Sequence, residues 1–226
     1  MTDWTVERFS GSADTHHGRD VADGTGRSVW AFAVAQPTLV LGSTQPEADV
    51  DDGAATNLGV EVVRRRSGGG AVLLDPGQVV WLDVIVPRGD PLWDDDVVTS
   101  AQWLGDAWAR ALDDLGVPGG DVHRGGLMAS VLGPVVCFAG TGPGEVLVAG
   151  RKVVGISQRR TRAGARFQCS VPIVWDGARH TALLGPGIRR VAPDADPVEA
   201  VDALAVGALG GAAPDAVVDA LVAQLP

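Results

Sequence analysis

An almost uninterrupted apolar run at residues 79–86 constrains the fold of this chain more than any other segment. The run reads Val-Val-Trp-Leu-Asp-Val-Ile-Val, and its β-branched and aromatic residues favour a strand. Near-continuous hydrophobicity over such a length is typical of a strand that is covered on both faces. We therefore expect residues 79–86 to form a central strand of a β-sheet.

Other strand-like segments lie on both sides of one long amphipathic segment. Strands are expected at residues 4–10, 28–34, 38–42, 60–64, 135–138, 145–148, 152–156 and 166–174. Residues 97–115 have helical apolar spacing, with aspartates at positions 94–96 suited to the first turn and Gly116 suited to the end. Short helices are expected within residues 47–58 and near 197–209 and 214–225. This order predicts an α+β fold with a mixed β-sheet flanked by helices.

The charge balance and the two cysteines narrow the class of protein. The chain has 18 basic and 28 acidic residues, a net charge of −10, which disfavours nucleic-acid and anionic-membrane partners. It has no run of about 18 apolar residues that would span a bilayer, and its N-terminus does not resemble a signal peptide. Two cysteines make neither a disulfide framework nor a metal-binding pair. We expect a cytoplasmic protein without a metal centre built from its own side chains.

The single lysine of the chain, Lys152, is a second constraint. Seventeen arginines stand beside it, so arginine supplies almost all of the positive charge. A compact, rotatable ammonium differs from the flat guanidinium fork in size and donor geometry, and a site that needs it would keep its lysine. The composition alone is equally consistent with a lysine that is present by chance on a solvent-exposed face.

Three consecutive glycines, Gly68, Gly69 and Gly70, lie between two predicted strands and follow three arginines. Glycines let a ligand approach the backbone closely, and the exposed N–H groups of such a loop form a cradle for a carboxylate or phosphate. Arg65 would add charge-assisted contacts to the same anion. The alternative is a flexible turn beside a solvated basic patch. The loop has neither the Walker A nor the dinucleotide-binding pattern.

Lys152 itself follows a glycine turn and enters a predicted strand. From Arg151 to Arg166 there are six basic residues and no acidic one, which makes a local positive stripe in an acidic chain. The stripe would suit a ligand that carries phosphate or an acidic partner, and the alternative is a solvated hairpin.

Cys137 precedes a phenylalanine and follows two valines, a setting typical of a small core residue. It becomes a nucleophile only where a cation stabilises its thiolate. Lys152 would be that cation if the two segments paired as a hairpin around residues 140–144. Cys169 lies in an alternating strand and is interpreted as core. The four histidines show no metal-ligand spacing, and no serine sits in a nucleophile elbow.

Three ordered segments together resemble the lipoate–protein ligase A family, which shares its catalytic fold with biotin protein ligases and octanoyltransferases. They are Pro-Thr-Leu-Val-Leu-Gly-Ser-Thr-Gln at 37–45, Arg-Arg-Arg-Ser-Gly-Gly-Gly-Ala-Val at 64–72 and Gly-Arg-Lys-Val-Val-Gly-Ile-Ser-Gln-Arg-Arg at 150–160. The resemblance covers about residues 28–185. It implies a single catalytic domain over residues 1–226, with two short C-terminal helices at about 197–225 and no accessory domain.

The resemblance also implies an activity. Ligases of this family activate lipoate or octanoate with ATP and Mg²⁺ to an acyl-adenylate and pass the acyl group to a lysine of a lipoyl domain. By matching positions, Lys152 would contact the acyl carbonyl oxygen and the α-phosphate, where an ammonium stabilises developing charge. The other positions implied in substrate or nucleotide binding are Arg65, Ser67, Gly68, Gly69, Gly70, Ala71, Asp75, Gly155 and Gln158.

Departures from the ligase pattern keep two other activities open. Leu74 stands where the family has histidine and Gln78 where ligases have asparagine, which puts nucleotide and metal handling in question. Cys137-Phe138, followed by Glu145 and Lys152, resembles the arrangement of octanoyltransferases that form a thioester on cysteine. Those enzymes take octanoate from acyl carrier protein without ATP or another cofactor, although they more often have arginine where this chain has Gly70. A third hypothesis is a degenerate paralogue that only binds an acyl ligand or a lipoyl domain.

Overall fold

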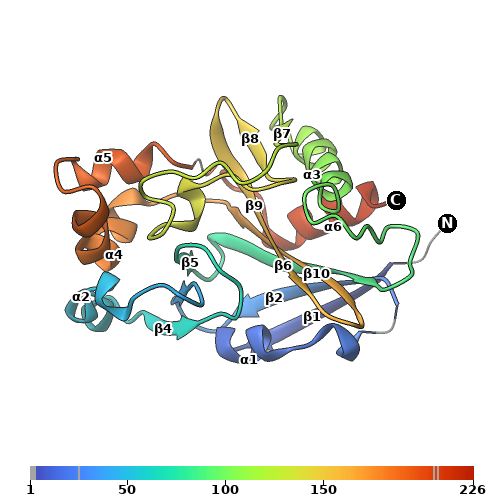
Figure 1. The fold of residues 1–226 in the computed structure, drawn as a ribbon, viewed down its shortest axis with the longest axis horizontal. Coiled ribbons are helices and arrows are strands. Elements are labelled where there is room, and N and C mark those ends of the chain that lie inside the picture. The colour runs from blue at the N-terminus through green and yellow to red at the C-terminus, as the bar shows by residue number, and fades with distance from the viewer. Residues whose placement is uncertain (1–3, 25, 206, 208) are drawn as a thin grey trace.

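A computed structural model of the protein describes residues 4–24, 26–205, 207 and 209–226. Its main layer is a seven-stranded sheet in which the predicted central strand lies third (Figure 1). In spatial order the strands are β1 (Thr5–Gly11), β2 (Ser28–Val34), β6 (Val79–Pro87), β10 (Gly164–Pro172), β9 (Arg151–Arg160), β8 (Val146–Val148) and β7 (Asp121–Val122). β1 and β2 are parallel and the other neighbours are antiparallel, so the predicted mixed sheet is confirmed.

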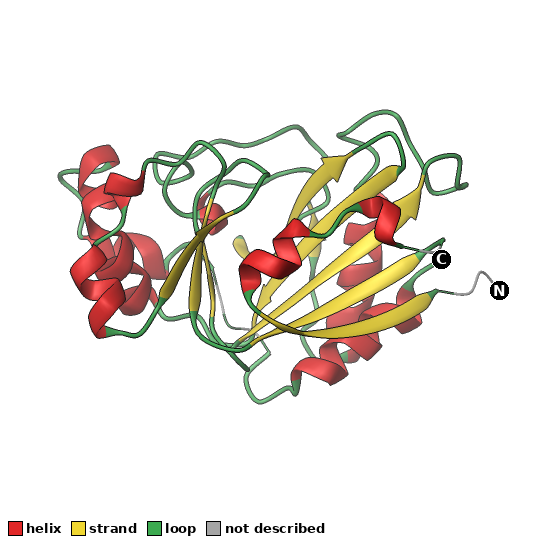
Figure 2. Ribbon diagram, turned by 90° about the horizontal axis from the view of Figure 1, so that it is seen from below, coloured by secondary structure: helices red, strands yellow, loops and turns green. Residues whose placement is uncertain are grey.

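A smaller sheet of three strands packs beside the main one (Figure 2). Its central strand, β3 (Thr38–Leu41), is parallel to β4 (Glu61–Arg64) and antiparallel to β5 (Val72–Leu74). Helices α2 (Asp52–Asn57), α4 (Gly177–Val191) and α5 (Pro197–Asp202) gather at the far side of this small sheet (Figure 2). Their apolar residues form one core cluster with β3, β5 and the segment around Val136.

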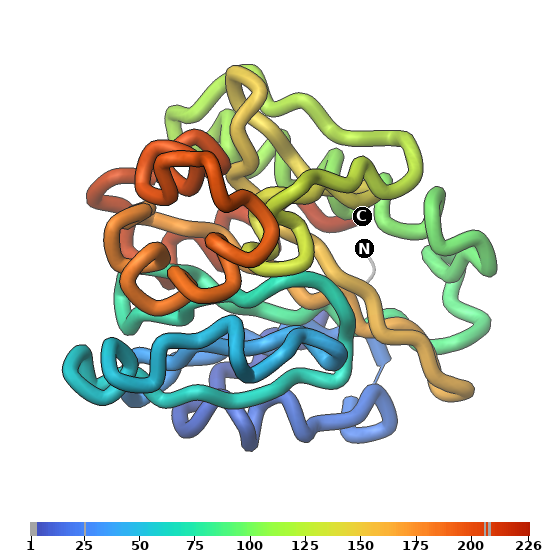
Figure 3. Tube along the Cα trace, turned by 60° about the vertical axis from the view of Figure 1, so that its left-hand side comes forward, coloured from blue at the N-terminus to red at the C-terminus, as the bar shows by residue number. Residues whose placement is uncertain are grey.

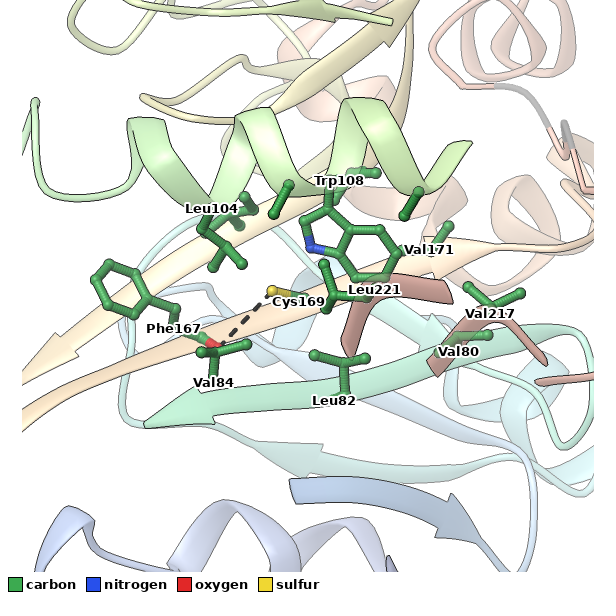
Figure 4. Packing of buried hydrophobic residues seen from close by; sticks show 14 of the residues in the cluster. Val80, Leu82, Val84, Leu104, Trp108, Phe167, Cys169, Val171, Val217 and Leu221 are labelled. Atoms are coloured by element: carbon green, nitrogen blue, oxygen red, sulfur yellow. Dashed lines mark hydrogen bonds between the residues drawn. The ribbon is translucent and has the colours of Figure 1, made fainter. Parts of the chain in front are cut away.

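The main hydrophobic core lies on one face of the large sheet, under α3 (Gln102–Asp114) and α6 (Pro214–Gln224). Figure 4 shows Leu82 and Cys169 on neighbouring strands, packed against Trp108 of α3 and Leu221 of α6. Strand side chains alternate between faces. Because these apolar positions use one face, the alternate positions of β6 and β10 must face the other way.

The opposite face of the large sheet carries the polar side chains. Trp81 is paired with Ser170, and Asp83 with Gln168, across β6 and β10. The short helix α1 (Ala13–Gly18) covers this face, and Arg166 fixes it there. The Arg166 guanidinium binds the Asp83 carboxylate at 2.5 Å and donates to backbone carbonyls of residues 16, 17 and 19. The face of the sheet opposite the main core thus carries polar side chains in fixed positions, which suits a binding site.

Helix α4 was not predicted from the sequence. Its residues include Gly-Pro-Gly at 185–187, which normally ends a helix. Asp176 caps its first turn, and the backbone N–H of Asp51 donates to the carbonyl of Leu183 at 2.8 Å. A neighbouring segment therefore satisfies a carbonyl at the interruption, and the helix continues because tertiary contacts outweigh local propensity.

Two predicted helix ends and one predicted strand were also wrong. Helix α3 begins at Gln102 and not at Val97, because Asp94 and Asp96 accept backbone hydrogen bonds within the preceding turns instead of capping the helix. Residues 135–138 do not form a strand; a short 3₁₀ helix, η3 (Cys137–Ala139), follows a single bridge between Val136 and Ala71. Helix α5 ends at Asp202, short of the predicted residue 209, and residues 206 and 208 lie outside the described residues.

The remaining short elements are η1 (Val21–Asp23) and η2 (Glu47–Asp49). Among the described residues, no helix has the length and apolar character needed to cross a membrane.

Candidate active site

The glycine loop and the Cys137 segment are bound together through their backbones. The N–H of Ala71 donates to the carbonyl of Val135 at 2.8 Å, and the N–H of Cys137 donates to the carbonyl of Ala71 at 3.0 Å. Gly70 lies so close that a Cβ atom there would be 2.5 Å from the Val136 nitrogen. Figure 3 shows the yellow-green segment that contains Cys137 beside the teal loop and the orange C-terminal helices. The close approach explains why this loop position is glycine.

Arg65 lies beside the thiol of Cys137. Its buried guanidinium donates from Nη2 to the carbonyls of Gly68 and Gly70, at 2.7 and 2.8 Å, and this nitrogen is 3.9 Å from Cys137 Sγ. Arg65 therefore holds the glycine loop from within and places a positive charge beside the half-buried thiol. A guanidinium in this place stabilises negative charge that develops on sulfur.

Lys152 is buried and forms an ion pair with Glu145. Its Nζ is 2.7 Å from Oε2 of Glu145 and donates to the backbone carbonyl of Cys137 at 3.1 Å. The Glu145 carboxylate also accepts from the N–H groups of Gly142 and Ile156, at 2.6 and 2.9 Å. These bonds fix the ammonium in direction, and they leave one of its three N–H donors without a partner among the described residues.

The predicted hairpin between Cys137 and Lys152 does not form. Lys152 is the second residue of β9, whose hairpin partner is β8, and the turn lies at Ala149 and Gly150 rather than at residues 140–144. Lys152 reaches Cys137 at its carbonyl and not at its thiol. The two residues are close, but through a different pairing from the predicted one. Glu145 is the partner of Lys152 and Arg65 is the neighbour of the thiol, and neither contact was predicted from the sequence.

Two cavities meet at Cys137. The inner pocket, of about 50 Å³, has apolar walls. Those walls are Val40, Val72, Leu74, Trp81, Phe138 and Ile156. The outer groove, of about 420 Å³, is lined by residues 68–70, by Lys152 and by the segment around Leu127 and Ser130. Cys137 and Glu145 line both cavities. The Cys137 side chain therefore lies between an apolar pocket and a larger groove.

The inner pocket also has polar residues that the sequence reasoning did not select. Gln168 and Ser170 come from β10, and His17 comes from α1. The sequence does contain a pattern that indicates Gln168 and Ser170, since both alternate with apolar residues within a buried strand. His17 had no such signal, because a histidine in a short polar segment is common and only the docking of α1 brings it to the pocket.

The other predicted site residues fall into two groups. Gly155 lies in the wall of the inner pocket, and Ser67 donates to Gln168 Oε1 at 3.2 Å. Gln158 instead bonds to Ser100 and to the carbonyl of Val97, and it lines neither cavity. Asp75 lies outside both cavities as well, paired with Arg179 at 3.1 Å. The structure thus does not bring Gln158 or Asp75 to the thiol.

Burial sets the protonation of groups around the site. It lowers the pKa of His17 to about 3, with a contribution from the positive charge of Arg166, so the imidazole is neutral at ordinary pH. Burial strongly raises the pKa of the Cys169 thiol, which is therefore inert, while Cys137 remains half-exposed. Burial also raises the pKa of Asp75 despite its arginine partner.

Residues 12–221 match the family described as the lipoyl protein ligase A/B catalytic domain. The chain belongs to this family. A curated relative, the octanoyltransferase LipM of Moorella thermoacetica, is 33% identical over 132 residues, which are 57% of this chain and 47% of the relative. The matched segment thus spans about half of that relative's length.

Solved structures show the same fold at low identity. The T. acidophilum protein Ta0514 with bound lipoic acid has a TM-score of 0.70 at 19% identity, over 98% of this chain and 83% of that chain. A lipoate-protein ligase A bound with ATP has a TM-score of 0.66 at 17% identity, over 98% and 82% of the two chains. The expected lipoate-ligase fold, a mixed sheet with flanking helices, is confirmed.

Proposed function

We propose that this protein is an acyltransferase of protein lipoylation that carries a medium-chain acyl group as a thioester on Cys137. The acceptor in this proposal is a lysine of a lipoyl domain, and the donor is octanoyl-acyl carrier protein. The observation that carries the proposal is the position of Cys137. Its half-exposed thiol lies 3.9 Å from the Arg65 guanidinium, between an apolar pocket and a larger groove.

In the first step, the sulfur of Cys137 attacks the carbonyl carbon of the donor thioester. The new carbon–sulfur bond forms and the bond to the donor sulfur breaks, and the donor thiolate takes the proton that Cys137 has lost. Arg65 stabilises negative charge on the attacking sulfur, and the remaining N–H of Lys152 would donate to the carbonyl oxygen as it becomes an oxyanion. The hydrocarbon tail lies in the inner pocket, where burial is favourable.

In the second step, the neutral amine of the acceptor lysine attacks the thioester carbonyl from the groove. The amide bond forms, the bond to Cys137 breaks, and the leaving thiolate takes one proton from the amine. The same ammonium serves both additions, since both place negative charge on the same oxygen. Because Lys152 is held by Glu145 and by the Cys137 carbonyl, it does not need to reorganise between them.

Intact mass spectrometry after exposure to octanoyl-acyl carrier protein tests this route. The wild-type protein should gain one octanoyl group, and Cys137→Ala should lose the adduct. Cys169→Ala is the matched control and should keep it, since that thiol is buried and protonated. An adduct that persists in Cys137→Ala would rule out the site, and transfer to a lipoyl domain would refute the hypothesis of a degenerate, binding-only paralogue.

A ligase that uses ATP and Mg²⁺ is the second candidate, and the residues that line the groove support it. The backbone of residues 68–70 lines that groove beside Lys152, and a protein of this fold has been solved with ATP. Magnesium prefers oxygen ligands. Glu145 is the one carboxylate among the described residues of the groove, and its oxygens are already engaged by Lys152 and two backbone N–H groups. These residues do not fit the ion.

The ligase candidate makes a separate chemical prediction. Incubation with octanoate or lipoate, ATP and Mg²⁺ should produce acyl-AMP, which liquid chromatography would detect, and Cys137→Ala should leave that product unchanged. If no adenylate forms under any condition and an adduct forms on Cys137, the ligase hypothesis is excluded and the transferase hypothesis is supported.

A further inference from the structure

Glu145 lines both cavities, and its carboxylate binds only one of the two cations of the site. Oε2 of Glu145 is 2.7 Å from Lys152 Nζ and accepts from the N–H of Gly142 at 2.6 Å. Oε1 accepts from the N–H of Ile156 at 2.9 Å. The Glu145 side chain is 6% exposed and the Lys152 side chain 3%. This buried pair is held in one arrangement, because separating the charges would leave each of them unpaired.

The two cations meet Cys137 at different atoms. Arg65 Nη2 is 3.9 Å from the sulfur, and its guanidinium otherwise contacts backbone carbonyls among the described residues. Lys152 Nζ donates to the carbonyl oxygen of Cys137 at 3.1 Å and forms no hydrogen bond with the sulfur. A thiolate on Cys137 would attract both cations, and the carboxylate of Glu145 competes with it for the ammonium. The carboxylate thus accounts for the division of the two cations.

We propose that Glu145 is a positioning residue that holds the Lys152 ammonium away from the Cys137 sulfur, so that Arg65 acts on the sulfur and Lys152 on the acyl oxygen. This inference rests on the proposed function, in which these two atoms develop negative charge. An ammonium has three N–H donors. Glu145 and the Cys137 carbonyl take two of them, which leaves one for the oxyanion in the groove that Lys152 lines. Glu145 itself neither takes nor gives a proton.

The single lysine of the chain allows a direct measurement of this contact. Protein labelled with ¹⁵N-lysine contains one labelled Nζ, and the protons of a buried, hydrogen-bonded ammonium exchange with water slowly enough to give one ¹H–¹⁵N signal. We expect this signal in the wild type, and we expect it to disappear or shift in Glu145→Gln. Whichever way the glutamine amide turns, its NH₂ group replaces an oxygen that accepts a hydrogen bond in the wild type. An unchanged signal in Glu145→Gln would overturn the inference.

Two reactions of Cys137 distinguish positioning of the ammonium from a general loss of structure. Alkylation by iodoacetamide needs the thiolate but forms no oxyanion, whereas acylation by octanoyl-acyl carrier protein needs both. We expect Glu145→Gln to lower the rate of acylation by about 10- to 100-fold, up to the loss typical of one oxyanion donor. The rate of alkylation should stay close to that of the wild type. Asp90→Asn is the control, since it removes a carboxylate from an ion pair with Arg27 outside both cavities, and it should change neither rate.

Acylation of Glu145→Gln at the wild-type rate, or equal losses of acylation and alkylation, would also overturn the inference. Glu145→Asp keeps the charge but withdraws it by one methylene group, and it should recover part of the acylation rate. If circular dichroism shows that Glu145→Gln does not fold, Glu145→Asp takes its place and should lower acylation more than alkylation. The NMR measurement needs no acyl donor. If the wild type forms no adduct while its lysine signal depends on Glu145, the transferase route is wrong and the placement of Lys152 by Glu145 stands.

Discussion

At the scale of single residues, the site depends on two cations with different surroundings. Arg65 donates to the carbonyls of its own loop and lies beside the thiol, while Lys152 is paired with Glu145 and lines the groove. Arginine at position 152 would be wider and planar, and it would have to replace a lysine side chain that is almost fully buried beside Glu145. The single lysine therefore fills a place that arginine does not fit.

Lys152→Arg should lower the rate of acyl transfer by at least about 100-fold, the cost typical of losing one well-placed oxyanion donor. The fold should be retained, as judged by circular dichroism. Arg162→Lys is the control, because Arg162 is exposed in the β9–β10 turn, and it should leave the rate unchanged. Near-normal transfer by Lys152→Arg would show that the ammonium is not required.

At the scale of elements, the glycine loop and η3 behave as one unit. Ala71 forms backbone hydrogen bonds with the residues on both sides of Val136, and Arg65 donates hydrogen bonds to two carbonyls of the loop. The nucleophile is thus positioned by main-chain contacts with a segment more than 60 residues away. A change in the loop should therefore reach Cys137 through the main chain.

Gly70→Ala tests this coupling. The new Cβ would meet backbone atoms of Val135 and Val136 at 2.6 and 2.5 Å, so we expect a loss of about 1–3 kcal/mol in the free energy of unfolding and slower acylation of Cys137. Gly68→Ala is the matched control, since no described atom would lie within 4 Å of a Cβ at that position. Urea unfolding and the rate of adduct formation would measure both effects. Equal behaviour of the two variants would contradict the coupling.

At the scale of the whole molecule, packing of segments that are distant in the chain buries histidine side chains, and burial favours their neutral form. Burial lowers the pKa of His16, His17 and His180 below the ordinary value of 6.5. In the unfolded chain these histidines take up protons as the pH falls below about 6.5, whereas in the folded protein they do not until lower values, about 3 for His17. Their contribution to stability is present at neutral pH and is lost as the pH falls through this window.

Urea unfolding at pH 7.5, 6 and 5 should therefore show a decrease in stability that is smaller in His17→Phe than in the wild type. The difference between the two slopes isolates His17 from carboxyl groups that titrate in the same range. Identical slopes would show that the imidazole is not held neutral in the folded state.

Elements with strong local patterns and loops with short contiguous motifs could be predicted from the amino-acid sequence alone. Residues 79–86 had to form a buried strand because of their continuous hydrophobicity, and the glycines at 68–70 marked a close backbone approach. Alternation, helical spacing and contiguous motifs are properties of neighbouring residues, which a sequence displays directly. Lys152 was visible for a related reason, as a single exception in an arginine-rich chain.

Which side chains come into contact depends on how the elements pack in three dimensions. The path of η3, the pairing of Lys152 with Glu145, the place of Arg65 beside Cys137 and the arrival of His17 at the pocket all depend on segments far apart in the chain. The helix at residues 177–191 also depends on such contacts, because local propensity opposes it. Pairings of this kind are set by the packing of whole elements, and no local pattern encodes them.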